Sequence, residues 1–170
     1  MKLLSAAVEA YAHFGLSAEV GMTISAGLFM PEQDWKTLKT IAKGAKGLKL
    51  RRWIPDLEGE LRGAQASVSQ CGYNTALALL RSRVPALVIP YSSGVSDTEQ
   101  ICRARKMEQK RLARVLMPER VTGQVLAAEI RKVLEFKSGV TRFDMNGARN
   151  ALKIIQMMMR ARSHVRENNR

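Results

Sequence analysis

The sequence predicts an α/β fold, in which a parallel sheet carries helices on both of its faces. Short apolar segments alternate along the chain with longer segments whose apolar residues recur at helical spacing. Gly or Pro separates many of these segments, and no internal repeat or low-complexity tract interrupts the alternation. This pattern is typical of parallel strands that are joined by right-handed crossover helices.

The first half of the chain opens on an amphipathic helix, for which Gly15 is a suitable stop. The next strand is closed by Pro31. A helix then begins with Glu32 and Asp34, where acidic groups favour the helix dipole, and it ends before Gly44. The elements expected here are helix 2–14, strand 21–29, a helix that carries Trp35, Leu38 and Ile41, strand 48–54, helix 58–64, strand 66–70 and helix 74–82.

The second half continues the alternation and ends in a long basic helix. In this last helix Leu152, Ile155 and Met159 form part of an apolar row, while Arg149 and Lys153 contribute positive charge. Such a helix either packs its apolar side on protein, which we favour, or lies on an anionic membrane. The elements expected are strand 85–90, helix 98–111, strand 113–117, helix 124–134 and helix 146–165.

Composition limits the classes of function. The 170 residues contain 28 Lys and Arg against 15 Asp and Glu, a formal net charge of +13. This charge favours nucleic acid, an acidic membrane face or phosphate-bearing ligands, although a solvated basic surface explains it equally well. Cys71 and Cys102 match no metal-ligand spacing, and His13 and His164 lie far apart. We therefore expect reduced thiols, no metal site and a cytoplasmic protein without a secretion signal or a membrane span.

The most informative segment is Ser69-Gln-Cys-Gly-Tyr-Asn-Thr75, in which a strand turns on a single Gly into a helix. The first N–H groups of a helix have no intrahelical partner, and α/β sheets commonly bind phosphate at such a corner. A structural turn is the simpler interpretation of Gly72 taken alone. Two further motifs follow in order: the strand Pro85-Ala-Leu-Val-Ile-Pro90, and the pair Glu99-Gln100 with Arg103 one turn later.

Together these motifs resemble the C-terminal, donor-binding half of family 28 glycosyltransferases, over residues 2–136. The similarity is greatest to predicted glycosyltransferases with a Ser-Gln-x-Gly-Tyr-Asn-Thr signature. The resemblance implies a Rossmann-like domain, the C-terminal half of a GT-B fold, at residues 1–136, followed by a loop and basic helix at 137–170. It implies transfer of a hexosyl group from a nucleoside-diphosphate sugar, a UDP-sugar in our interpretation, to an acceptor. An N-terminal domain or a partner subunit would bind that acceptor and supply the general base.

The resemblance also implies roles for individual residues. The amides after Gly72 would face the donor diphosphate, Glu99 and Gln100 would hold sugar hydroxyls, and Trp53 with Ile54 would flank the nucleotide base. No metal and no cofactor are expected beyond the nucleotide sugar as co-substrate. The donor-binding residues expected are Ser69, Gln70, Gly72, Tyr73, Asn74, Thr75, Glu99, Gln100 and Arg103.

Three features depart from the family pattern. Ala78 stands where the family has a Glu that binds the ribose, the first and central strand of the domain is missing, and so is the acceptor-binding domain. Without the central strand two sheet edges would be exposed, unless neighbouring strands close the gap, a partner chain fills it, or Met1 is not the natural start of the protein. We favour the interpretation that the chain is one half of a larger enzyme, truncated or split.

Other interpretations remain open. A basic nucleic-acid-binding module would explain the net charge, although few aromatic residues are available for base stacking, so we do not expect nucleic acid as a partner. A nucleotide-sugar epimerase of GT-B type is the third alternative. At single positions, Glu99 could serve only the helix dipole and Trp53 could belong to the core.

Overall fold

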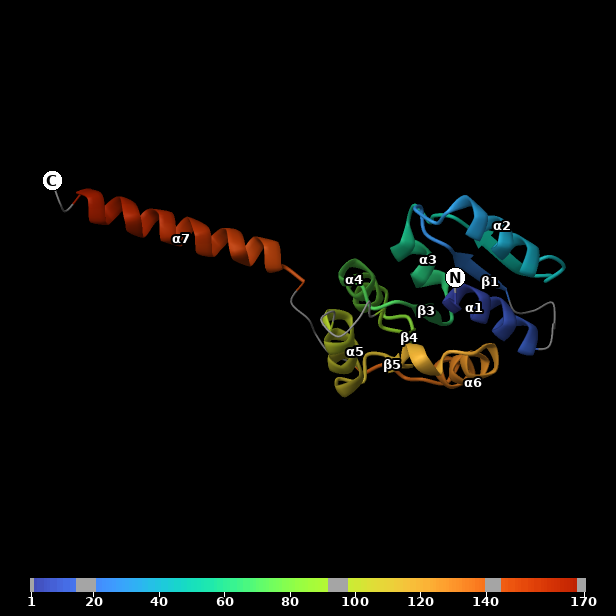
Figure 1. Ribbon diagram of the computed structural model, residues 1–170. Coiled ribbons are helices and arrows are strands. Elements are labelled where there is room, and N and C mark those ends of the chain that lie inside the picture. The colour runs from blue at the N-terminus through green and yellow to red at the C-terminus, as the bar shows by residue number, and fades with distance from the viewer. Residues whose placement is uncertain (1, 15–20, 92–97, 140–144, 168–170) are drawn as a thin grey trace. The chain divides into compact units, whose positions relative to one another are not determined.

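The computed structural model describes residues 2–14, 21–91, 98–139 and 145–167, with the side chains of residues 160–167 left out (Figure 1). It divides into two compact units, Met1–Gly139 and Val140–Arg170. The first unit holds every strand described, and we treat each unit by itself.

The first unit contains a three-stranded parallel sheet in which β4 lies between β3 and β5. Residues of β4 alternate between two cores, because successive side chains of a strand point to opposite faces. Leu87 packs in a cluster with α1 and α6, whereas Ala86 and Val88 pack in a cluster with α3, α4 and α5. The elements are β3 Ser67–Ser69, β4 Ala86–Val88, β5 Arg114–Val115, α1 Lys2–His13, α3 Leu57–Gly63, α4 Tyr73–Ser82, α5 Glu99–Gln109 and α6 Gly123–Leu134.

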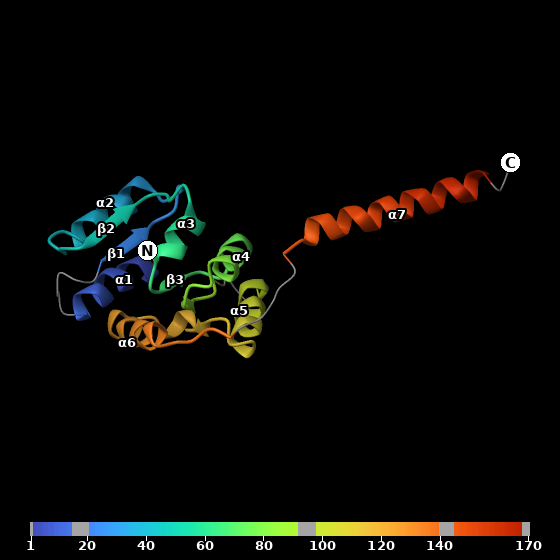
Figure 2. The same ribbon diagram turned by 180° about the vertical axis from the view of Figure 1, so that it is seen from behind.

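Helices therefore cover both faces of this sheet, which confirms the predicted fold class. Helices α1 and α6 pack directly against each other, and both ribbon views show them side by side (Figure 1, Figure 2). Gly123 allows this close approach, since a Cβ built there would lie 2.4 Å from the Cβ of Glu9. A short 3-10 helix, η1 Pro118–Arg120, connects β5 to α6.

The first unit also contains a two-stranded parallel sheet of β1 (Met22–Ser25) and β2 (Leu48–Arg51), joined by α2 (Glu32–Ile41). The apolar side chains Ile24 and Leu38 are buried with Val8 of α1 in a third cluster. The alternate residues of the two strands are polar, so this sheet has one apolar face and one polar face.

The strands are shorter than the sequence predicts, although each lies inside its expected range. The strand expected at 21–29 ends at Ser25, since Gly27 adopts a φ of +94° and turns the chain before α2. Within the part of the chain that the structure describes, β1 and β3 do not pair, so the neighbouring strands do not close the gap expected at the central position.

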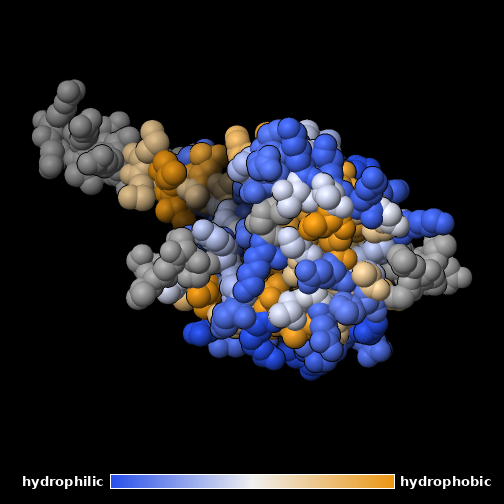
Figure 3. Space-filling view, turned by 45° about the vertical axis from the view of Figure 1, so that its right-hand side comes forward, coloured by the Kyte–Doolittle hydropathy of each residue, from blue (hydrophilic) through white to orange (hydrophobic). Residues whose placement is uncertain are grey.

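The second unit consists of one described helix, α7 Gly147–Glu167. Its apolar side chains are exposed and form the orange surface along this helix (Figure 3). None of the helices described is long and apolar enough to cross a bilayer. The exposed apolar residues are Leu152, Ile154, Ile155, Met157, Met158 and Met159.

Candidate functional site

The predicted phosphate-binding corner lies where β3 passes into α4. Gly72 is the N-cap of α4, and no side chain caps the helix there. The first backbone bond of the helix runs from the N–H of Ala76 to the carbonyl of Gly72, at 2.9 Å. The N–H groups of the residues between them, Tyr73 to Thr75, have no acceptor within the helix. The corner therefore presents donors that have no partner in α4, together with the positive end of the helix dipole.

Gly72 itself is not required by the fold. Its backbone is extended, with φ −62° and ψ 156°, a conformation open to any residue. Among the described residues, a Cβ built at this position would meet only the Oγ1 of Thr75, at 4.0 Å. The absence of a side chain therefore leaves space among the described residues in front of the α4 amides, into which an anionic group could approach closely.

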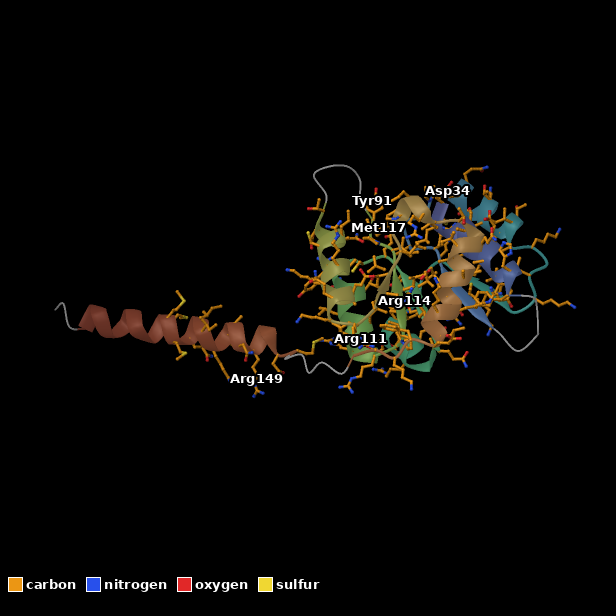
Figure 4. All side chains as sticks on the ribbon, turned by 90° about the horizontal axis from the view of Figure 1, so that it is seen from below. Asp34, Tyr91, Arg111, Arg114, Met117 and Arg149 are labelled. Atoms are coloured by element: carbon orange, nitrogen blue, oxygen red, sulfur yellow. The ribbon has the colours of Figure 1, made fainter. Side chains whose placement is uncertain are left out.

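Gln100, in the first turn of α5, fixes the position of this corner. Its Oε1 accepts hydrogen bonds from the N–H of Cys71, at 3.1 Å, and from the N–H of Tyr91, at 3.0 Å. Tyr91 follows β4, and Figure 4 shows it at the same end of the parallel sheet as Met117, which follows β5. One side-chain oxygen thus ties together the loops after two neighbouring strands, and the amide NH2 of Gln100 is left to donate elsewhere.

Arg103 holds the same loop from the next turn of α5. Its Nη1 donates to the carbonyl of Cys71 at 2.6 Å, and its Nη2 pairs with the carboxylate of Glu99. The guanidinium also lies 5.8 Å from the ring centre of Tyr73, within cation–π range. A fixed positive charge therefore stands beside the first turn of α4, where it adds to the attraction for an anion.

Two side chains at the end of β3 differ in their chemistry. Burial raises the pKa of the Cys71 thiol, against an opposing effect of the positive charge of Arg103, so this thiol stays protonated at neutral pH. The Oγ of Ser69 is buried, and it is a hydroxyl for which the described structure offers no hydrogen-bond partner. A buried unpaired hydroxyl beside the corner is a group that a ligand could satisfy.

The structure brings most of the predicted site residues together. The residues of the Gly72 corner and those of the α5 start lie at the carboxyl ends of β3 and β4, linked through Cys71. Trp53 and Ile54 instead follow β2, in the other sheet. Trp53 is 58% exposed, so the alternative that it belongs to the core is wrong.

The motifs of the sequence do not predict the part played by the main-chain groups of Cys71 and Tyr91. Both residues directly follow predicted strands, which was the available signal, since loops after parallel strands meet at one edge of a sheet. The motifs do not predict Arg52 either, whose guanidinium pairs with Glu32 and lies 5.1 Å from the ring centre of Trp35. Neither contact follows from motif spacing.

Comparison with known proteins gives a family match. Residues 29–158 match the glycosyltransferase family 28 C-terminal domain. Among curated relatives, a protein of Geobacillus thermodenitrificans is 39% identical over 98 residues, which are 55% of this chain and 27% of that protein. A protein of Anaeromyxobacter sp. is 31% identical over 85 residues, 50% of this chain and 22% of the relative. Both are named UDP-N-acetylglucosamine–N-acetylmuramyl-(pentapeptide) pyrophosphoryl-undecaprenol N-acetylglucosamine transferase. The matches cover only about a quarter of the length of these relatives.

Two solved structures share the fold. The Acinetobacter baumannii MurG structure aligns with a TM-score of 0.72 at 14% identity, over 92% of this chain and 46% of that one. A crystal structure of the glycotransferase of kitacinnamycin aligns with a TM-score of 0.60 at 19% identity, over 79% of this chain and 31% of the other.

Proposed function

Since this chain belongs to the glycosyltransferase family 28 C-terminal domain family, we propose that it binds the sugar donor, a UDP-sugar, of a hexosyltransferase. A further domain or a partner subunit would bind the acceptor. One observation carries the proposal: in the part of the chain that the structure describes, no side chain caps the first turn of α4 and none fills the space in front of Gly72. The curated relatives are named as transferases that use a UDP-sugar, which favours this function over a nucleic-acid-binding module or an epimerase.

The diphosphate would bind at the α4 corner. The N–H groups of Tyr73, Asn74 and Thr75 and the dipole of α4 would contact its oxygens, and the charge of Arg103 would add attraction. Hydrogen bonds to charged groups contribute about 1.5–3 kcal/mol each, so three of them supply about 5–9 kcal/mol, against the roughly 8 kcal/mol of a micromolar affinity.

The sugar would lie between this corner and the start of α5. The NH2 of Gln100 would donate to a sugar hydroxyl, because its oxygen is already used by two backbone amides. The carboxylate of Glu99 would accept from another hydroxyl. The uracil would lie near Trp53 and Ile54, where an exposed indole can stack on a base. Ala78 offers no acceptor to the ribose, so we expect the diphosphate to contribute more of the affinity than the nucleoside.

In the reaction, an acceptor hydroxyl would attack the anomeric carbon and the nucleoside diphosphate would leave. Negative charge on the leaving group grows in the transition state, so donors that already point at the phosphates lower the barrier. The amides after Gly72 need no reorganisation to do this, since Gln100 and Arg103 hold the preceding loop in place. The general base would come from the acceptor-binding part.

Calorimetric titration of this chain with UDP and UDP-N-acetylglucosamine tests the proposal. We expect both ligands to bind, UMP to bind at least about tenfold more weakly, and inorganic pyrophosphate to compete. UMP is the matched control, because it keeps the nucleoside and lacks the second phosphate. A protein that binds neither UDP nor UDP-sugar, even with a longer N-terminal sequence attached, would contradict the proposal.

We also propose that α7 gives the protein a peripheral contact with anionic membranes. Its exposed apolar side chains, among them Leu152, Ile155 and Met159, combine with the positive charges of Arg149 and Lys153. Helices of this composition bind the interface of a bilayer through both apolar burial and attraction to acidic lipids.

A further inference from the structure

Tyr73 carries an aromatic ring that contributes little to the core. It is the first residue of α4, and it is 64% exposed. The same helix buries Ala76 and Leu79 in the cluster shared with α3 and α5, but Tyr73 belongs to none of the buried clusters of the described residues. A large ring in this position is therefore available for contact with a ligand.

One face of the ring is already occupied. The guanidinium of Arg103 lies over the ring, 5.8 Å from its centre. That guanidinium is itself held in place, because its Nη1 donates to the carbonyl of Cys71 and its Nη2 pairs with the carboxylate of Glu99. The side chain of Arg103 is only 20% exposed, and such shielding from water strengthens a cation–π contact. The ring is thus held toward the start of α5, and its exposed surface includes the second face.

The ring is held by the same two elements that would hold the donor. In the proposed function, the N–H of Tyr73 is one of three that bind the diphosphate at the start of α4. On the α5 side, Glu99 and Gln100 would contact the sugar hydroxyls, and Arg103 joins that side to the ring. The exposed face of the ring is therefore next to the place proposed for the sugar.

We propose that Tyr73 is a specificity-determining residue, whose exposed ring face stacks on the sugar ring of the donor. This inference rests on the proposed function, which uses only the N–H of this residue. The C–H groups of a pyranose carry partial positive charge because their carbons bear oxygen, and the negative face of an aromatic ring attracts them. The hydroxyls at the edge of the pyranose stay free to bond to Glu99 and Gln100.

The same contacts favour an uncharged hexopyranose. The carboxylate of Glu99 is exposed and is already paired with Arg103. An acidic sugar would bring a second carboxylate close to that of Glu99, and like charges at short range disfavour each other. A hexose or an N-acetylhexosamine brings only hydroxyl and amide groups, which Glu99 and the NH2 of Gln100 can satisfy. We therefore expect UDP-glucose and UDP-N-acetylglucosamine to bind more tightly than UDP-glucuronate.

Calorimetric titration of Tyr73→Leu with UDP and with UDP-N-acetylglucosamine tests the stacking. Leu keeps the backbone N–H and an apolar side chain but removes the ring. We expect the dissociation constant for UDP-N-acetylglucosamine to rise at least about fivefold, and that for UDP to change by less than about twofold. Binding of UDP to the same sample shows that the variant is folded. Tyr73→Phe restores the ring without the hydroxyl and should recover the lost affinity.

Proton NMR of the bound donor gives a readout that a purely structural role of Tyr73 would not affect. Protons that lie over the face of an aromatic ring shift upfield. We expect the pyranose protons of UDP-N-acetylglucosamine to shift upfield in the presence of the parent chain or of Tyr73→Phe, and not in the presence of Tyr73→Leu. The uracil protons serve as the internal control, because both variants should affect them equally.

Arg103 is the positioning residue of the ring in this proposal. Arg103→Lys keeps a positive charge but loses the planar fork that reaches Cys71, Glu99 and the ring together. In the parent chain this substitution should weaken the binding of UDP-N-acetylglucosamine more than that of UDP. In Tyr73→Leu it should change the ratio of the two dissociation constants little, because the ring that Arg103 positions is already absent.

The results that would overturn the stacking differ from the result that would contradict the proposed function. A parent chain that binds no UDP contradicts donor binding itself, and the stacking with it. Where UDP binds, three results overturn the stacking alone: an unchanged ratio of the two dissociation constants in Tyr73→Leu, no upfield shift of the pyranose protons with the parent chain, or tighter binding of UDP-glucuronate than of UDP-glucose.

Discussion

The substitution Gly72→Asp tests whether the start of α4 binds phosphate or is only an ordinary helix N-terminus. Asp is a better N-cap than Gly by a few tenths of a kcal/mol, and its charge at a helix start adds about 0.3–1 kcal/mol. The position has room for it, because a Cβ there meets only Thr75 Oγ1, at 4.0 Å, among the residues that the structure describes. The carboxylate would accept from the N–H groups of Asn74 or Thr75, which have no partner within the helix. We therefore expect the free energy of unfolding to rise by about 0.5–1 kcal/mol.

The affinity for UDP, in contrast, should fall in Gly72→Asp. The new carboxylate occupies amides that the diphosphate needs and repels its charge. The loss of two charge-assisted hydrogen bonds costs about 3 kcal/mol or more, which is at least about 100-fold in the dissociation constant for UDP. Thermal melting and calorimetric titration measure the two effects on the same sample. Gly72→Ser should also stabilise α4 and weaken binding, by a smaller factor, since it adds a cap without a charge.

The matched control lies in another helix. Thr122 caps α6, where its Oγ1 accepts from the N–H of Val125 at 3.2 Å. Thr122→Asp places the same carboxylate at a helix start away from the proposed site, and it should leave UDP affinity within about twofold. UDP affinity that survives in Gly72→Asp, or that falls equally in Thr122→Asp, would refute the assignment of the diphosphate to the α4 corner.

Three further predictions follow from side-chain contacts. Gln100→Leu leaves the N–H groups of Cys71 and Tyr91 without their acceptor, so it should lower the free energy of unfolding in urea by about 1–3 kcal/mol. Gln100→Glu keeps the acceptor but loses the NH2 donor, so it should chiefly weaken UDP-sugar binding, as measured by calorimetry. Burial alone would raise the pKa of Glu129, but hydrogen bonds and charges of Lys132 and Arg114 hold that pKa below its ordinary value of 4.5. A lowered pKa means that ionised Glu129 stabilises the folded protein at any pH above the ordinary pKa, and that this stabilisation is lost as the pH falls through the folded pKa. The variant Glu129→Gln lacks this contribution. Its free energy of unfolding should therefore fall less than that of the parent between neutral pH and about pH 3. Finally, Ile155→Asp in α7 should reduce co-sedimentation with phosphatidylglycerol vesicles at least about tenfold relative to Ile155→Leu. Neither variant should bind phosphatidylcholine vesicles. Equal co-sedimentation of the two variants would contradict a role of α7 in membrane binding.

The order and type of the elements could be predicted from the sequence, because the apolar spacing in each segment matches the helix or strand that the structure shows there. The predicted start of α4, at residue 74, lies one residue after the observed start at Tyr73, because a lone Gly followed by a helical pattern is a local signal. The predicted strand at 21–29 is too long, because the apolar composition continues through Leu28 and Phe29 but both side chains are exposed. Periodicity does not distinguish a strand from an extended loop of similar composition.

Only part of the candidate site could be predicted from the sequence, because some of its contacts depend on tertiary packing. The Gly72 corner depends on the backbone, and its sequence pattern predicts it directly. The contacts of Gln100 and Arg103 with Cys71 join residues 29 and 32 positions apart and depend on where α5 packs. The split of the sheet is likewise a tertiary property. The sequence indicated a missing central strand, but only the pairing of β1 with β2 and of β3 with β4 excludes closure by the neighbours that are described.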